Sequence, residues 1–299
     1  MYTSFNARAL GLNMSTERTL ELASLAGFEG VDLLVRDLLE RNEDPREIRS
    51  RMDDLGLLGG AFPLPVDWKD DPQRFEADLG RLPRYAEAAA ELGLLRTGTW
   101  VLPETPSRPE SEAKLPAYLA SVAAWHVDRL GKMARVLEPY GVMLGLEVIG
   151  VERFRKGTGV PFVACMADLD RRLPAIWDEA NNLGILFDSY HLYAAGEPAE
   201  AGLAWGIERV VWTHVSDLDR DAPDDRTAIT DGDRALPGHR GVVDCKGHLQ
   251  RLWAQGYKGP VTAEPLAGCR MLQGLDDETV ARNVAGALRS VWPSPSRLT

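Results

Sequence analysis

The chain has 299 residues, of which 44% are hydrophobic, and a formal net charge of −11 at pH 7. This much apolar sequence can form a large buried core, so the composition excludes a disordered or fibrous protein. The negative charge repels phosphate backbones and anionic lipid, which argues against nucleic-acid and membrane partners and favours a small uncharged or cationic ligand.

A helical stretch, a glycine and a short apolar run recur along the chain, after a first predicted strand at residues 2–6. The apolar runs are too short for helices and are expected to be strands, while each glycine suits the left-handed position that ends a helix. Asp44-Pro45 and Asp71-Pro72 are typical helix starts. The repeats are AGFEGVDLLV with Gly27, LGLLGGAFPL with Gly56, LGLLRTGTWV with Gly93, YGVMLGLEVI with Gly141, LGILFDSYHL with Gly184 and QGYKGPVTAE with Gly256, and ERVVWTHVSD adds one further strand.

These units predict the fold. Strands that alternate with helices and are apolar on both faces indicate a parallel sheet covered by helices. Eight units in a chain of this length predict an α/β fold, a single (β/α)8 TIM barrel domain over residues 1–299, with a doubly wound sheet as the alternative. The longest irregular stretch, residues 217–241, is expected to be the loop after the seventh strand and to close over a site.

Polar side chains end the last four predicted strands: Glu147, Asp188, His214 and Glu264. In a barrel these strand ends meet at one rim, where active sites lie. Three carboxylates held together repel one another unless a cation compensates. Oxygen and imidazole ligands without thiolate suit Mn²⁺, Mg²⁺, Co²⁺ or Zn²⁺. We therefore predict a divalent metal site at this rim. The structural alternative is that the four are ordinary polar residues at strand ends.

Two further residues are predicted to bind substrate. His191 lies three residues after Asp188, and Arg220 lies six residues after His214 in the long loop. A cation or hydrogen-bond donor at either place can stabilise negative charge on a substrate oxygen. A packing histidine and a solvated surface arginine are the structural alternatives.

The remaining histidines and the tryptophans fit structural roles. His126 lies in a strongly helical stretch and is expected to pack or to lie on the surface, and His248 is expected to face solvent. Trp68 and Trp100 lie near strand ends, where core packing and sugar stacking both remain open.

Cysteine usage and the apolar pattern indicate the compartment. The three cysteines form no CxxC pair, which is typical of reduced thiols. The first residues show no apolar segment behind basic residues, and no apolar run approaches the roughly 20 residues of a membrane span. We expect a soluble cytoplasmic protein.

Several motifs resemble the sugar phosphate isomerase/epimerase branch of the xylose-isomerase-like TIM-barrel superfamily, which includes ketose 3-epimerases and inosose-processing enzymes. They are GLEVIG, FDSYH, HVSDLDR and TAEPL, and DRALPGHRGVVD resembles the glycine-containing loop after the seventh strand. The resemblance runs nearly end to end. It implies a metal held by Glu147, Asp188, His214 and Glu264, and substrate contacts from His191 and Arg220.

The resemblance implies a metal-dependent sugar isomerase or epimerase, with Mn²⁺ as the expected ion. Glu147 and Glu264 would be the catalytic residues, on opposite sides of a ketose or inosose carbon next to the carbonyl, and would move its proton through an enediolate. An inosose-type dehydratase on the same metal site and a non-catalytic sugar-binding barrel are the alternatives. A nuclease of the same superfamily is disfavoured, because no histidine precedes His126 and the net charge opposes DNA.

Two departures from ketose 3-epimerases concern the substrate. Those enzymes often carry a second glutamate six residues beyond the first ligand, where this chain has Arg153. The glycine loop here is longer by about one residue, with His239-Arg240 between Gly238 and Gly241. The first difference predicts a different substrate end, and the second predicts a differently shaped cover over the site. The chain also lacks a glycine-rich phosphate loop with a lysine, which favours an unphosphorylated substrate. Barrels of this branch commonly pair, so a homo-oligomer is one expected state.

Overall fold

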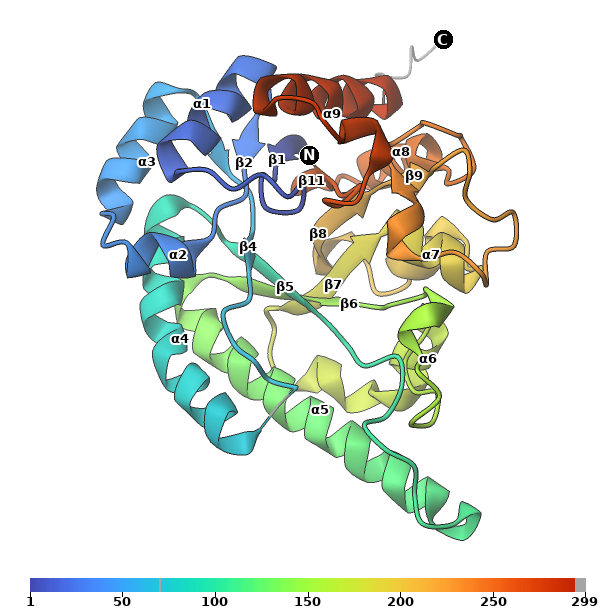
Figure 1. Cartoon of the computed structure of the whole chain (residues 1–299). Helices are drawn as coiled ribbons and strands as arrows, with labels where there is room; N and C mark the ends of the chain where they lie inside the picture. Colours follow the sequence, from blue (N-terminus) through green and yellow to red (C-terminus); the bar gives the residue numbers. More distant parts are fainter. Residues whose placement is uncertain (70, 294–299) are drawn as a thin grey trace.

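The main sheet closes on itself into a barrel (Figure 1). The computed structural model describes residues 1–69 and 71–293. Strands follow the order β3-β2-β1-β11-β8-β7-β6-β5-β4, and every neighbouring pair is parallel. β3 and β4 stand at the two ends of this order but are separated in the chain by residues 60–61 alone. The predicted (β/α)8 barrel is therefore confirmed, with its third strand divided in two.

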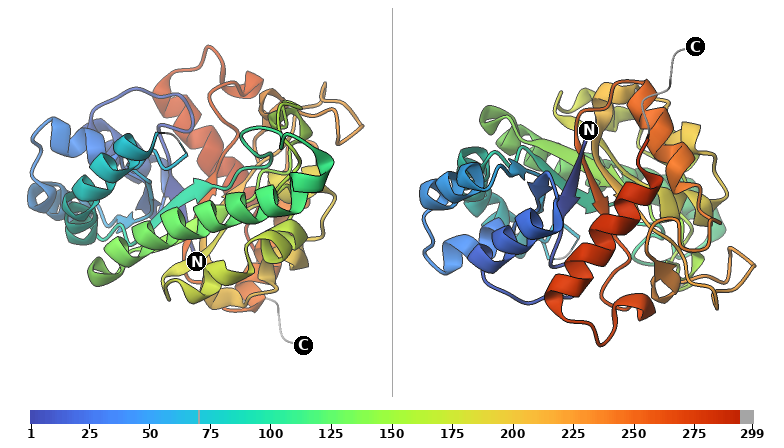
Figure 2. Two further views of the ribbon diagram at one scale, coloured as in Figure 1. Left: turned by 90° about the horizontal axis from the view of Figure 1, so that it is seen from below. Right: turned by 90° about the horizontal axis from the view of Figure 1, so that it is seen from above.

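The strands form the inner layer, and helices cover it from outside (Figures 1 and 2). The barrel strands are β1 (Tyr2–Phe5), β2 (Gly30–Val31), β3 (Leu58–Gly59), β4 (Phe62–Pro63), β5 (Arg96–Trp100), β6 (Met143–Glu147), β7 (Leu183–Asp188), β8 (Val210–Val215) and β11 (Pro260–Ala263). The α-helices are α1 (Thr16–Ala26), α2 (Val35–Glu40), α3 (Pro45–Asp54), α4 (Pro72–Leu92), α5 (Leu115–Leu137), α6 (Met166–Arg172), α7 (Ser189–Ala195), α8 (Cys245–Ala254) and α9 (Asp277–Val291). In the part of the chain that the structure describes, none of these helices combines the length and the apolar character that a membrane crossing requires.

The division of the third strand has a local cause at Gly60. A Cβ on Gly60 would lie 2.1 Å from Oδ1 of Asp32 and 2.2 Å from Oγ of Ser4. The same Oδ1 accepts a hydrogen bond from the backbone N–H of Ala61 at 2.8 Å. The chain therefore passes against a buried carboxylate here instead of continuing the regular strand pairing.

Most predicted helix ends are confirmed. The carboxylates of Asp44 and Asp71 cap α3 and α4, accepting hydrogen bonds from the N–H groups of Arg46 at 2.9 Å and Gln73 at 2.8 Å. The prediction is wrong at Gly184, which lies inside β7. A Cβ there would lie 2.2 Å from the carbonyl oxygen of Arg209, so close backbone packing requires this glycine. The predicted glycines that do have a positive φ are Gly27, Gly56, Gly93, Gly141 and Gly256.

The loop after β8 is more regular than predicted. β9 (Asp217–Leu218) and β10 (Arg234–Ala235) form a short antiparallel pair, and a 3-10 helix, Asp231–Asp233, precedes β10. The Asp217 carboxylate also accepts a hydrogen bond from the N–H of Arg240 at 2.7 Å. The expectation of an irregular stretch over residues 217–241 is thus wrong at residues 217–218 and 231–235, because the pairing of β9 with β10 orders these two segments.

The first and last elements of the barrel lie next to each other. α1 and α9 pack side by side (Figure 2), and Arg289 donates a hydrogen bond to the carbonyl oxygen of Ala26 at 3.2 Å. β1 pairs with β11, and the ammonium of Met1 donates to the carbonyl oxygen of Tyr257 at 3.0 Å. These contacts hold the barrel closed across its first and eighth strands.

Candidate metal centre and active site

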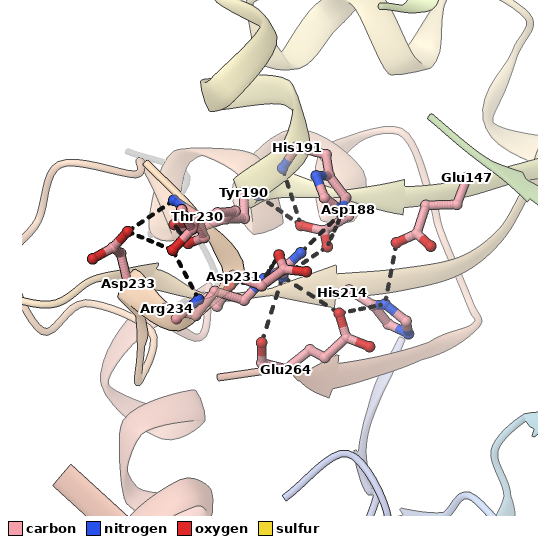
Figure 3. Close-up of polar contacts among 12 residues, drawn as sticks. Glu147, Asp188, Tyr190, His191, His214, Thr230, Asp231, Asp233, Arg234 and Glu264 are labelled. Atoms are coloured by element: carbon pink, nitrogen blue, oxygen red, sulfur yellow. Dashed lines mark hydrogen bonds and ion pairs between the residues drawn. The ribbon is translucent and has the colours of Figure 1, made fainter. Parts of the chain in front are cut away.

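Four side chains from consecutive barrel strands meet at one rim (Figure 3). Glu147 ends β6, Asp188 ends β7, His214 lies near the end of β8, and Glu264 directly follows β11. Each residue offers one ligand atom, and these atoms all lie within 4.8 Å of one another. The structure therefore brings together the four residues predicted from the strand ends.

His214 lies between two carboxylates. Its Nδ1 is 3.3 Å from Oε2 of Glu264 and 3.8 Å from Oε1 of Glu147. Within the described residues, both ring nitrogens and Oε1 of Glu147 are buried without a hydrogen-bond partner. Burial alone would lower the pKa of His214, but the charges of Glu264 and Glu147 raise it well above its usual value.

Unpartnered buried polar atoms are uncommon, so these three atoms need an explanation. A divalent cation between the imidazole and the carboxylate oxygens would satisfy one ring nitrogen of His214 and Oε1 of Glu147, and it would offset the repulsion among three neighbouring carboxylates. The donor set of the cluster therefore fits such a cation.

Asp188 is held by an arginine that the sequence interpretation missed. Nη1 of Arg234, in β10, lies 2.9 Å from Oδ2 of Asp188 and 3.3 Å from Oε2 of Glu264. Oδ1 of Asp188 accepts a hydrogen bond from the N–H of Tyr190 at 2.7 Å. Burial alone would raise the pKa of Asp188, but the positive charge of Arg234 holds it below its usual value. Asp188 is thus kept ionised and oriented within the cluster.

Arg234 is itself fully enclosed by polar and aromatic groups. Its Nε lies 3.0 Å from Oδ1 of Asp231, and its Nη2 donates to Nε2 of His191 at 3.0 Å. The guanidinium carbon lies 4.4 Å from the ring centroid of Tyr190. Arg234 lies in the DRALPG motif, but that motif predicted only the glycine-containing loop and no role for this side chain.

The two residues predicted to bind substrate lie in different surroundings. His191 is buried and accepts a hydrogen bond from Arg234, so its proton lies on Nδ1, an atom without a partner in the described structure. Arg220 is exposed, and within residues 1–69 and 71–293 it forms no hydrogen bond or ion pair with the cluster. The structure thus places Arg234, and not Arg220, against two of the predicted ligands, Asp188 and Glu264. The substrate-binding role of His191 and Arg220 stays a prediction.

A cleft of about 380 Å³ opens above the cluster. Glu147 and Glu264 are 13% and 18% exposed, whereas the side chain of Asp188 is fully sealed. The two glutamates therefore present carboxylate oxygens to a ligand in the cleft. Its volume and its mixture of apolar and charged groups suit a small molecule. The lining residues include Glu147, His214, Glu264, Trp100, Trp212, Leu186, Lys69 and Arg8.

A buried polar network supports the cluster from below. Asp32 accepts hydrogen bonds from Oγ of Ser4 at 2.7 Å and Oγ1 of Thr262 at 2.8 Å. Thr262 in turn accepts from Nε1 of Trp212 at 3.0 Å, and the ring of Trp212 packs edge-on against His214 at 4.3 Å. Burial raises the pKa of Asp32. This network fixes the ring plane of His214 from within the barrel.

Several known proteins are similar to this chain. The family model for the xylose isomerase-like TIM barrel matches residues 20–291. A solved xylose isomerase domain protein from Alicyclobacillus acidocaldarius subsp. acidocaldarius is 30% identical, with a TM-score of 0.78 and coverage of 97% of this chain and 98% of that one.

Two curated relatives are named as enzymes. A 3-dehydroshikimate dehydratase of Pseudomonas aeruginosa is 29% identical over 85% of this chain and 37% of its own length. An inosose isomerase of Bacillus subtilis is 28% identical over 46% of this chain and 45% of its own length. The similarity thus spans less than half of each of these two proteins.

Proposed function

Because the chain belongs to the xylose isomerase-like TIM-barrel family, we propose that it is a metal-dependent isomerase or epimerase acting on a ketose or inosose. The observation that supports the proposal is that the four-residue cluster borders the cleft. Four ligand atoms lie within 4.8 Å of one another, and two glutamates among them face the cleft. A barrel that only bound a sugar would not need two partly exposed carboxylates beside the same imidazole.

The two glutamates are the proposed proton carriers. Glu147 and Glu264 approach His214 from β6 and from the end of β11, on either side of β7 and β8. A substrate carbon held between them can lose its proton to one carboxylate and regain it from the other or from the same one. Return to the opposite face gives an epimer, and return to the neighbouring carbon gives an isomer.

The other cluster residues hold and tune the site. Together with the glutamates, Asp188 and His214 would hold the ion, for which Mn²⁺ is the expected identity. A bound divalent cation supplies stabilisation of the negative charge that develops on the substrate oxygen. Arg234 keeps Asp188 ionised, and the side chain of Asp188 is sealed from solvent, so this aspartate serves as a ligand and leaves proton transfer to the glutamates.

Dehydration is a second candidate function. The similarity to the 3-dehydroshikimate dehydratase covers 85% of this chain, against 46% for the inosose isomerase. Loss of a β-hydroxyl begins with the same removal of a proton next to a carbonyl, so the same two glutamates would serve. The product of the reaction separates the two candidates.

The test is deuterium exchange with purified protein and Mn²⁺ in D2O, followed by NMR on ketoses, inososes and 3-dehydroshikimate. We expect deuterium to enter next to the carbonyl, and Glu147→Gln and Glu264→Gln each to abolish it. Glu152→Gln, which changes an exposed glutamate in the loop after β6, is the matched control and should exchange normally. Binding of these compounds without exchange on any of them would contradict the proposal and favour a non-catalytic sugar-binding barrel.

A further inference from the structure

One side of the cleft carries a lysine without a carboxylate partner. Nζ of Lys69 lies 4.7 Å from the ring centroid of Trp68 and 4.1 Å from that of Trp100. It donates a hydrogen bond to Oγ1 of Thr99 at 3.2 Å. Within the described residues it forms no ion pair, and an ammonium carries three donors. Two N–H bonds thus remain for a group in the cleft.

The ammonium is held in place by its neighbours. Oγ1 of Thr99 also accepts a hydrogen bond from Nε1 of Trp68 at 2.9 Å, which fixes both the hydroxyl and the indole. The two indole faces attract the cation by cation–π interaction. Burial lowers the pKa of Lys69 to about 8, so the side chain is still mostly charged at neutral pH. The lysine is therefore a desolvated cation in a fixed position.

This cation lies beside the candidate metal centre. Trp100, over which it sits, is paired in register with Glu147 on the neighbouring strand. Adjacent strands are about 4.8 Å apart, so a ligand touching Glu147 is within reach of Lys69. Arg8 lines the same cleft from the chain after β1, and it is exposed and without an ion pair in the described structure.

Desolvated ammonium groups are costly unless an anion accompanies them. The negative charges of Asp67 and Glu147 attract the ammonium, but neither carboxylate forms an ion pair with it in the described structure, and burial still dominates its pKa. We propose that the substrate of this cleft carries an anionic group, a carboxylate or a phosphate, which binds Lys69 while its hydroxyl and carbonyl groups face Glu147 and Glu264. The inference rests on the proposed function in placing the substrate in this cleft. The net charge of the chain predicted an uncharged or cationic ligand, and an anionic substrate differs from that prediction. The difference is physically reasonable, because salt screens the distant negative charges while Lys69 lies in the cleft itself.

The test is calorimetric titration of the whole protein with three probes that share a hydroxylated six-membered ring. Shikimate carries a carboxylate, myo-inositol 1-phosphate a phosphate, and myo-inositol no charge. We expect at least one anionic probe to bind about 10- to 100-fold more tightly than myo-inositol, the effect of one charge-assisted hydrogen bond. The anionic probe that binds more tightly identifies the group.

Lys69→Met should remove this preference, so that the anionic probes bind no more tightly than myo-inositol, whereas Lys69→Arg should keep most of it. Lys258→Met, an exposed lysine just before β11 at the opposite end of the barrel, is the matched control. Lys69→Gln replaces the methionine variant if that variant does not fold. Equal affinity for charged and neutral probes, no binding of either anion, or an unchanged preference in Lys69→Met would each overturn the inference.

The same titrations separate this inference from the proposed function. Deuterium exchange that is equally efficient on neutral and on carboxylated ketones would overturn the anionic substrate and leave the proposed function standing. Lys69-dependent binding of shikimate, together with no exchange on any compound, would support the anion site and contradict the proposed reaction.

Discussion

Replacing Arg234 with methionine tests whether one buried arginine holds the candidate metal centre together. The side chain is 2% exposed, and its guanidinium contacts Asp188 at 2.9 Å, Asp231 at 3.0 Å and Glu264 at 3.3 Å. Methionine occupies similar space but removes the charge and every hydrogen bond. Asp188, whose side chain has no solvent exposure, then loses its cation and keeps backbone N–H donors.

The size of the effect follows from this burial. Removing one partner of a buried ion pair typically costs about 3–5 kcal/mol, because the other charge stays buried without compensation. At about 2.1 cal/mol/K per residue, a chain of 299 residues unfolds with an entropy of roughly 0.6 kcal/mol/K. We therefore expect Arg234→Met to lower the Tm by roughly 5–8 °C.

Thermal unfolding followed by circular dichroism, in EDTA so that no cation replaces the arginine, measures this shift. Arg220→Met is the matched control, since Arg220 is an exposed arginine in the same loop, and an exposed substitution of this kind should change the Tm by less than about 1 °C. A Tm for Arg234→Met within about 2 °C of the unchanged protein would refute the reasoning, because the carboxylates would then not depend on Arg234.

Three further predictions concern metal binding, pH and two glycines. Saturation with Mn²⁺ at about 100 times its Kd should raise the Tm of the EDTA-treated protein by about 4 °C, and Glu264→Gln should reduce this gain; no shift would count against a metal site. Burial lowers the pKa of His126 and of His248 to about 4, below the value of 6.5 for the unfolded chain, so the unfolded state binds more protons. The free energy of unfolding should thus fall as the pH drops from 6.5 to 4, by about 3 kcal/mol for each histidine. Urea titrations at several pH values should show that this free energy depends less steeply on pH in His248→Phe. Gly286→Ala, on α9 with open space for a Cβ, should stabilise the protein by up to about 1 kcal/mol, because alanine favours a helix more than glycine does. Gly184→Ala should destabilise it, because the new Cβ would meet the carbonyl oxygen of Arg209. Urea unfolding measures both effects.

The barrel and the candidate metal ligands could be predicted because they leave periodic signals. Most predicted strands follow a helix and a glycine, and polar residues lie at the ends of the last four apolar runs, so Glu147 and Asp188 could be placed at one rim from their positions in the repeats alone. Gly184 followed the same pattern but serves a different purpose, since both a helix cap and a close approach of two backbones select glycine. The sequence pattern does not distinguish these two causes.

The missed residues depend on contacts between distant parts of the chain. Arg234 reaches Asp188 across 46 residues, and only the pairing of β9 with β10 brings it there. Lys69 lies in an irregular segment after β4, where no periodicity marks which side chains face the cleft. His248 was expected in solvent, but its ring packs on that of Phe187 at 4.1 Å. None of these contacts follows from local spacing.

The closure of the barrel between β1 and β11 has a consequence during synthesis. The carbonyl oxygen that receives the hydrogen bond from Met1 belongs to a residue 256 positions later. At about 5–20 residues per second, a ribosome needs roughly 13–50 s to make that interval. During this time one edge of β1 has no strand beside it, and unpaired edges attract other chains. Among the strands of this barrel, β1 is therefore made early but is completed only when β11 pairs with it, and until then its free edge is a site for aggregation.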